Sequence, residues 1–231
     1  MNKKNYTPYD IHALYHKHVP KTKEYFTKYN KVPLHLQDNK WKWDGHDYAR
    51  IPCLLDFREW ILKYNIKSNK LLYTSNEDPE ILYLEYKQKY LAEYNIETHT
   101  NDLHTLNLPD KDFDFILFSQ TLEHLFDPVQ AMTSLLTHLV PGGYIFTSVP
   151  IINIAHMTPI HFGSMTQIGL ITLFDRFNLE ILEVGQWGNK QYLNYIFEKQ
   201  WWPDYRNLID RHGVIPNEPI NACSTWILAK K

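Results

Sequence analysis

Polar residues follow several short apolar runs of this chain, and together they could contact a ligand. The runs KLLYT (70–74) and FDFILFS (113–119) are typical of buried strands. In an open parallel sheet a ligand lies beyond the carboxyl ends of the strands, so the residues at those ends are the candidate contacts. They are Thr74, Ser75, Asn76, Glu77, Asp102, Leu103, Ser119 and Gln120, together with the stretch after Pro150.

His156 and His161 follow a third run, YIFTSVP (144–150), and should lie at the same edge of the sheet. Histidine can accept a proton near neutral pH, so either residue is a candidate general base or an anchor for a second substrate. Glu123 follows the strand at 113–119 and should line the same cleft. The simpler alternative is that these side chains only hydrogen-bond nearby backbone. No metal is expected, because no carboxylate accompanies the histidine spacing.

Other histidines and tryptophans have weaker cases. His99, His104 and His138 are expected at the surface. Trp187, Trp201 and Trp202 could form an aromatic wall for a sugar or another planar substrate, with core packing as the favoured alternative.

The elements that would position these residues alternate along the chain from residue 70 onward. Asp-Pro pairs at 78–79 and 127–128 are helix-start signals, and apolar residues recur at helical spacing after residue 52. The sequence predicts helices over 53–65, 79–94, 127–139 and 165–177, and strands over 70–74, 96–100, 113–119, 144–150, 179–187 and 223–231. PGG (141–143) should form a tight turn between the second-to-last helix and its following strand.

This alternation predicts an α/β fold with a doubly wound, mostly parallel sheet. We expect an N-terminal extension or lid over residues 1–48, followed by one domain over 49–231 with an insertion at 190–222. The extension could also form a dimer contact, so a homodimer stays open.

Composition excludes several classes of protein. A formal net charge of −2 gives no basic field for nucleic acid, so no nucleic-acid partner is expected. No window approaches the ~18 consecutive apolar residues of a membrane span, and MNKKNYTPYD has no apolar signal region. The only cysteines, Cys53 and Cys223, are expected as free thiols, and a cytoplasmic location is expected.

The segment DLHTLNLPDKDFDFILFSQTLEHLFDP (102–128), followed by LVPGGYIFTSVP (139–150), resembles the class I S-adenosylmethionine-dependent methyltransferases. In that family an acid-containing loop, Leu-Pro, Phe-Asp, a buried strand, Leu-Glu-His, Asp-Pro and Pro-Gly-Gly occur in this order. HMTPIHFGSMTQIGL and GQWGN extend the similarity to about residue 185. The resemblance implies a Rossmann-like methyltransferase fold with S-adenosylmethionine as cofactor. It assigns Asp102 and Leu103 to the adenine, and Ser119 and Gln120 to the methionine portion.

The chain departs from that family after its first strand, where a glycine-rich turn normally meets the cofactor. Ser75-Asn76-Glu77-Asp78 stands there instead, and too few residues separate Ser75 from Asp102 for the usual elements. The sheet should therefore be shortened between its first and fourth strands. Either 79–94 is a helix, or ILYLEY (81–86) is a strand that places Glu85 at the ribose; the tyrosine spacing favours the helix.

Two functions follow from the resemblance. The first is an S-adenosylmethionine-dependent enzyme that methylates an oxygen of a small molecule or a glycan sugar. The alternative is an inactive homologue, a binding or scaffold module whose cofactor site has degraded.

Overall fold

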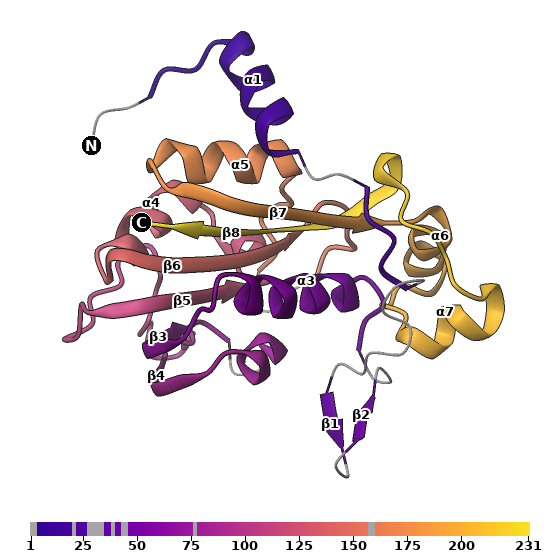
Figure 1. Cartoon of the computed structure of the whole chain (residues 1–231), viewed down its shortest axis with the longest axis horizontal. Helices are drawn as coiled ribbons and strands as arrows, with labels where there is room; N and C mark the ends of the chain where they lie inside the picture. Colours follow the sequence, from indigo (N-terminus) through magenta and orange to yellow (C-terminus); the bar gives the residue numbers. More distant parts are fainter. Residues whose placement is uncertain are drawn as a thin grey trace.

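Six strands of the computed structural model form one sheet in the order β4-β3-β5-β6-β8-β7 (Figure 1). The structure describes residues 4–19, 22–26, 35–37, 40–42, 46–75, 78–156 and 160–231. The sheet strands are β3 (Ser68–Tyr73), β4 (Tyr86–Leu91), β5 (Phe113–Ser119), β6 (Leu139–Pro150), β7 (Glu180–Gly188) and β8 (Ala222–Lys230). The main helices are α1 (Pro8–His18), α3 (Arg50–Lys63), α4 (Pro128–Leu136), α5 (Gln167–Arg176), α6 (Lys190–Lys199) and α7 (Tyr205–His212).

The sheet is parallel across β4, β3, β5 and β6, and β8 pairs antiparallel with both β6 and β7. The predicted mostly parallel α/β sheet is therefore confirmed. Three parallel strands, β3, β5 and β6, end side by side, since Tyr73 pairs with Leu117 and Ser119 with Ser148. This register brings the residues that follow the three strands to one edge of the sheet.

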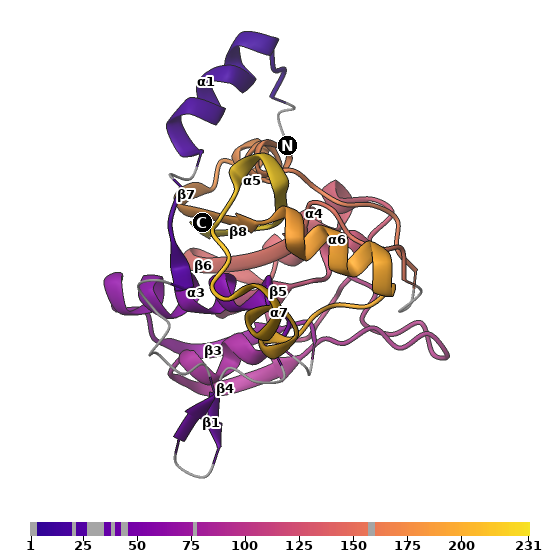
Figure 2. The same ribbon diagram turned by 90° about the vertical axis from the view of Figure 1, so that its right-hand side faces the viewer.

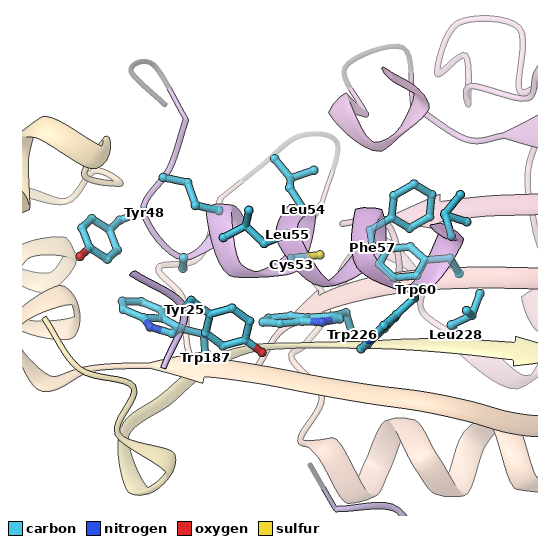
Figure 3. Packing of buried hydrophobic residues seen from close by; sticks show 14 of the residues in the cluster. Tyr25, Tyr48, Cys53, Leu54, Leu55, Phe57, Trp60, Trp187, Trp226 and Leu228 are labelled. Carbon is cyan, nitrogen blue, oxygen red and sulfur yellow. The ribbon is translucent and has the colours of Figure 1, made fainter. Parts of the chain in front are cut away.

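Helices cover both faces of the sheet. Successive residues of a strand face opposite sides, so Leu71 belongs to the core beneath α3, whereas Leu72 belongs to the core beneath α4 and α5. Figure 3 shows α3 over the strands, with Phe57 and Trp60 packed toward Trp226. The apolar spacing that predicted this helix and the helices near 127–139 and 165–177 is confirmed.

The prediction of a helix over 79–94 is wrong. A short 3₁₀ helix, η1 (Pro79–Tyr83), is followed by β4, which pairs in parallel with β3. β4 is an edge strand whose central residues are exposed, so it lacks the apolar alternation of a half-buried strand. Edge strands commonly carry lysine and other polar residues that block further pairing. That composition, with regularly spaced tyrosines, mimics an exposed helix.

Two further elements differ from expectation. Residues 96–99 form a turn that is closed by an isolated bridge between Asn95 and Thr100, because the Asn95 side chain accepts hydrogen bonds from the backbone N–H groups of Glu97 and Thr98. The PGG segment lies inside β6 and not between helix and strand. There the register with β5 shifts, and Gly142 has a φ of +80°, which glycine adopts without strain.

Segments outside the sheet pack around it or project from it. Just before α1, the side chains of Lys4 and Tyr6 donate hydrogen bonds to the Asp175 carboxylate of α5. The hairpin of β1 (His35–Gln37) and β2 (Lys40–Lys42) projects from the body (Figures 1 and 2). Residues 190–222 hold α6, α7 and the 3₁₀ turn η3 (Pro219–Asn221). The predicted domain boundaries and the lid stay predictions. Among the described residues, no helix combines the length and apolarity that a bilayer span needs.

A buried carboxylate sits in the core beneath α3. Asp56 accepts hydrogen bonds from Trp226 Nε1 at 3.0 Å and Tyr25 Oη at 2.7 Å, and Lys23 Nζ lies 2.5 Å from its other oxygen. Gly185 of β7 lies directly against this group, and a Cβ there would come within 2.0 Å of Trp226 Nε1 and 2.7 Å of Asp56 Oδ2. The close approach leaves no room for a larger residue.

The Gly185→Ala substitution should therefore destabilise the protein by about 1–3 kcal/mol, the usual effect of overpacking a core. Urea unfolding followed by circular dichroism measures the change. Gly163→Ala is the matched control, because a Cβ there meets nothing within 4 Å. Equal unfolding midpoints for the two variants would contradict this account of the core.

Candidate functional site

The carboxyl ends of the parallel strands open onto a cleft of about 1380 Å³. Its lining draws residues from each of the predicted strand ends. The predicted site residues among them are Thr74, Ser75, Asp102, Leu103, Ser119, Gln120, Glu123 and His156. Asn76 and Glu77 lie outside the described residues. His161 does not line the cleft itself, but its Nδ1 lies 3.2 Å from Nδ1 of His156.

The loops after β3 and β5 are tied together at the centre of the cleft. The hydroxyls of Thr74 and Thr121 lie 3.0 Å apart, and the Thr121 hydroxyl donates to the carbonyl of Ser119. Gln120 has a φ of +47°, an uncommon conformation for a residue with a side chain. Its side-chain amide donates to Ser148 Oγ at 3.0 Å, which fixes it across the end of β6. Such backbone strain clusters at functional sites.

A buried ion pair lies beneath these loops. Arg50, at the start of α3, places Nη2 2.7 Å from Glu80 Oε2, and its Nη1 donates to Ser148 Oγ at 3.0 Å. Glu80 is fully buried and also accepts from the Ser119 hydroxyl at 3.1 Å. The Ser119 side chain is therefore committed to Glu80.

Asp78 is the unsatisfied member of this group. It lines the cleft and is 5% exposed, and its Oδ2 has no hydrogen-bond partner among the described residues. Its Oδ1 lies 3.6 Å from Arg50 Nη2. Burial, and then the nearby Glu80 carboxylate, raise the pKa of Asp78 well above its usual value. A buried acceptor without a partner is costly, so this oxygen is suited to a cationic donor from a ligand.

Asp102 lies on the loop that replaces a strand after β4. Its Oδ1 accepts from the backbone N–H of His104 at 3.0 Å and lies 2.6 Å from His104 Nδ1. Partial burial would raise the pKa of Asp102, but these hydrogen bonds outweigh it and lower the pKa below the usual value. Both contacts use Oδ1, so Oδ2 can meet a ligand. His104 and His138 are buried, contrary to the expected surface positions, because each bonds to backbone within the fold.

The carboxylate after the second strand is Glu93, which sequence reasoning missed. It follows the end of β4 by two residues and lines the cleft. The alternative of Glu85 as ribose contact is wrong, because Glu85 precedes β4 and pairs with exposed Lys67 at 2.7 Å. A strand prediction over 86–91 would have pointed to Glu93 through the strand-end rule.

Three histidines and one glutamate gather at the other end of the cleft. The ring centroids of His124 and His156 lie 4.9 Å apart, and those of His156 and His161 lie 4.8 Å apart. Glu123 is 2% exposed, and burial raises its pKa to about 7. The carboxylate that the sequence lacked near His156 is thus supplied by Glu123, a strand earlier in the chain. Trp202 lines the cleft beside His156, whereas Trp187 is fully buried in the core.

Comparisons with known proteins agree with this geometry. Residues 69–147 match the family model described as a methyltransferase domain. That range spans β4, β5 and α4 and most of β3, so it carries the strand ends around Asp78, Asp102 and Ser119. No curated protein matches the chain.

Solved structures of methyltransferases are similar in fold. A candidate sarcosine dimethylglycine methyltransferase from Galdieria sulphuraria is 11% identical, covering 90% of this chain and 96% of its own, with a TM-score of 0.50. The N-methyltransferase NodS from Bradyrhizobium japonicum, in complex with S-adenosyl-L-homocysteine, is 12% identical over 84% of this chain and 93% of its own, with a TM-score of 0.46. A SAM-dependent methyltransferase from Aquifex aeolicus is 12% identical over 75% of this chain and 88% of its own, with a TM-score of 0.45.

The Arg50→Met substitution should destabilise the fold by about 3–5 kcal/mol, because it leaves the buried Glu80 carboxylate without its cation. Denaturant unfolding at neutral pH measures the loss. Lys67→Met is the control: it breaks the exposed Lys67–Glu85 pair, and such surface pairs contribute less than about 1 kcal/mol. If both variants unfolded at the same denaturant concentration, the Arg50–Glu80 pair would not have the role described.

Proposed function

We propose that the cleft of this chain transfers a methyl group to a hydroxyl of a small molecule or a sugar, because residues 69–147 match the model of a methyltransferase domain. The observation that carries the proposal is the convergence of polar residues from successive strand ends on one cleft of about 1380 Å³. Ligand pockets are commonly ~300–1,000 Å³, so this volume suits a cofactor together with an acceptor.

The cofactor fits the donors and acceptors on one side of the cleft. Asp102 Oδ2 accepts from the exocyclic amine of the adenine, and Leu103 packs against the ring. The acid after the second strand, Glu93, is placed for the ribose hydroxyls. Each of these residues lines the cleft.

The methionine portion is held without glycine by the buried charges after β3. The unpartnered Asp78 Oδ2 accepts from the α-ammonium group, which supplies the missing partner. Arg50, which also lines the cleft, supplies positive charge for the carboxylate. The side chains of Thr74 and Ser75 complete this end. Charged side chains thus replace the close backbone approach that a glycine turn would allow.

Bound S-adenosylmethionine supplies an electrophilic methyl group on a sulfonium, so the protein's task is to align the acceptor and remove its proton. His156 and Glu123 stand at the acceptor end of the cleft. Either can accept the proton that a hydroxyl loses as its oxygen bonds to the methyl carbon. His161 positions His156 through the contact between their Nδ1 atoms. Trp201 and Trp202 give the acceptor an aromatic surface, which suits the face of a sugar.

A titration with S-adenosyl-L-homocysteine tests this function against the scaffold alternative. An enzyme of this kind should bind it with measurable heat, and at 100 times the dissociation constant the fold should gain about 2.7 kcal/mol. A scaffold with a degraded site should show neither heat nor a thermal shift. The side chains of the described residues leave the cleft open, which supports the enzyme.

The Asp102→Ala substitution should weaken binding of S-adenosyl-L-homocysteine by about 1–3 kcal/mol, the range for a lost buried hydrogen bond. Isothermal titration calorimetry measures the change. Asp110→Ala is the control, because Asp110 is exposed and pairs with Lys70 away from the cleft. Unchanged affinity in Asp102→Ala would remove this residue from the adenine site.

The Asp78→Asn substitution should weaken binding of S-adenosyl-L-homocysteine but not of 5′-methylthioadenosine, which lacks the amino acid portion. The reason is that Asp78 contacts the α-ammonium group, and a charged hydrogen bond contributes about 1.5–3 kcal/mol. Paired calorimetric titrations of the two ligands give the difference. Asp102→Ala should weaken both ligands alike, so an equal loss for both in Asp78→Asn would refute the ammonium contact.

A further inference from the structure

The cluster at the acceptor end of the cleft has the composition of a metal site. One carboxylate oxygen of Glu123 and one ring nitrogen each of His124 and His156 lie within 4.8 Å of one another. Ligands around a bound zinc ion lie about 3.3 Å apart, given metal–nitrogen distances near 2.0–2.1 Å. Small rotations of these side chains therefore suffice to close the shell around one ion.

Hydrogen bonds already set the histidine tautomers for ligation. The carbonyl of Ile160 lies 2.9 Å from His124 Nδ1 and can only accept, so Nδ1 carries the proton and Nε2 keeps its lone pair. The carbonyl of Ile154 lies 3.2 Å from His156 Nδ1 and has the same effect on that ring. A backbone carbonyl that holds Nδ1–H of a histidine is the usual outer partner of a metal ligand.

His161 contacts His156 at its Nδ1 atom and can hold that ring in place. Its Nε2 lies 3.1 Å from the carbonyl of Gly163, so Nε2 carries the proton and Nδ1 can accept from His156 Nδ1. The loop that carries His161 is fixed to the glutamate, because the backbone N–H of Phe162 donates to the Glu123 carbonyl at 2.8 Å. Residues 123–124, 156 and 161–162 are therefore held together around the candidate metal position.

Glu123 provides an independent sign that a cation belongs here. Its carboxylate is 2% exposed, and no residue in the described part of the chain forms a hydrogen bond with Oε2. No ion pair joins it to a lysine, arginine or histidine within the described part of the chain. A buried carboxylate without a partner is destabilising unless it is neutralised, and the two histidine lone pairs beside it can serve as further ligands for a positive ion.

We propose that Glu123, His124 and His156 bind one divalent first-row transition ion of the Zn²⁺ or Mn²⁺ kind, with His161 orienting His156. Two imidazole nitrogens and one carboxylate select this class over Mg²⁺ and Ca²⁺, which prefer oxygen ligands. Three protein ligands would leave open positions on the ion, and all three of these residues line the cleft. If the proposed function holds, on which this step rests, the ion positions an oxygen of the methyl acceptor and lowers its pKa, so that the proton leaves to water and the ion takes the place of His156 or Glu123 as the activating group. Ion binding itself does not depend on the proposed function.

The test is a titration of the metal-stripped full chain with Zn²⁺ and separately with Mn²⁺, followed by calorimetry. The exposed His12 and His16 have Nε2 atoms 3.0 Å apart and could bind zinc weakly, so both are first changed to Ala. In this background we expect one ion per chain. Glu123→Gln and His156→Asn should each weaken binding at least 10-fold. Removal of the outer partner in His161→Ala should weaken it about 10–100-fold, the range for such groups. His138→Gln, a histidine outside the cleft, is the control and should leave it unchanged.

Cobalt spectroscopy gives a second readout that does not require the variants to fold. Co²⁺ bound to the unsubstituted cluster should show d–d bands of a nitrogen and oxygen site, without the thiolate charge-transfer bands that Cys53 or Cys223 would produce. Absence of ion binding, or affinity that stays unchanged in Glu123→Gln, overturns the proposal. Titrating S-adenosyl-L-homocysteine into the same samples keeps the hypotheses apart, because a protein that binds the ion but not this ligand refutes only the methyltransferase function.

Discussion

The structure depends on the neutralisation of one fully buried carboxylate, Glu80. Glu80 accepts hydrogen bonds from Arg50 of α3 and from Ser119 at the end of β5. Arg50 also donates to Ser148 of β6, which joins that strand to the network. The network fixes the helix that covers one face of the sheet to the ends of two neighbouring strands. It also forms the floor of the cleft at the point where a glycine turn would otherwise lie. The short 3₁₀ helix η1 carries Glu80 to this position.

The sequence predicted the parts of the fold in which burial leaves a strong pattern. The central strands β3 and β5 are buried on both faces over residues 71–73 and 115–119, so each contains a short apolar run, and α3 has a clear apolar stripe. The edge strand β4 gave the opposite signal, because one side meets solvent and its lysines and tyrosines carry no two-residue alternation. Because β4 was predicted as part of a helix, Glu93 was not recognised as a residue that follows a strand end. Pro141-Gly142-Gly143 was misplaced because a bulge and a turn use the same residues.

The candidate site was predictable only as far as the strand-end rule reaches. Asp102 lines the cleft from a loop, because residues 96–100 do not form the strand that was predicted before it. The strand-end rule itself places Thr74 and Gln120 at one edge once the sheet is parallel. It does not indicate that Ser119 is occupied by Glu80, or that Asp78 keeps a free oxygen, because both depend on side-chain packing. The assembly of Glu123 with His156 was out of reach for a similar reason. More than thirty residues and a strand separate them, so no local spacing marks the pair.

The strand order has a consequence for how the chain is made. β8 is the sole neighbour of β7 among the described strands, and it also separates β7 from β6. During synthesis, β7 (residues 180–188) therefore has no strand to pair with until the ribosome has added the residues of β8. The parallel half, including the edge that bears Asp78, Asp102 and Ser119, can dock beforehand. Vectorial synthesis thus favours an order in which the ligand-bearing half assembles first and a late antiparallel insertion completes the sheet.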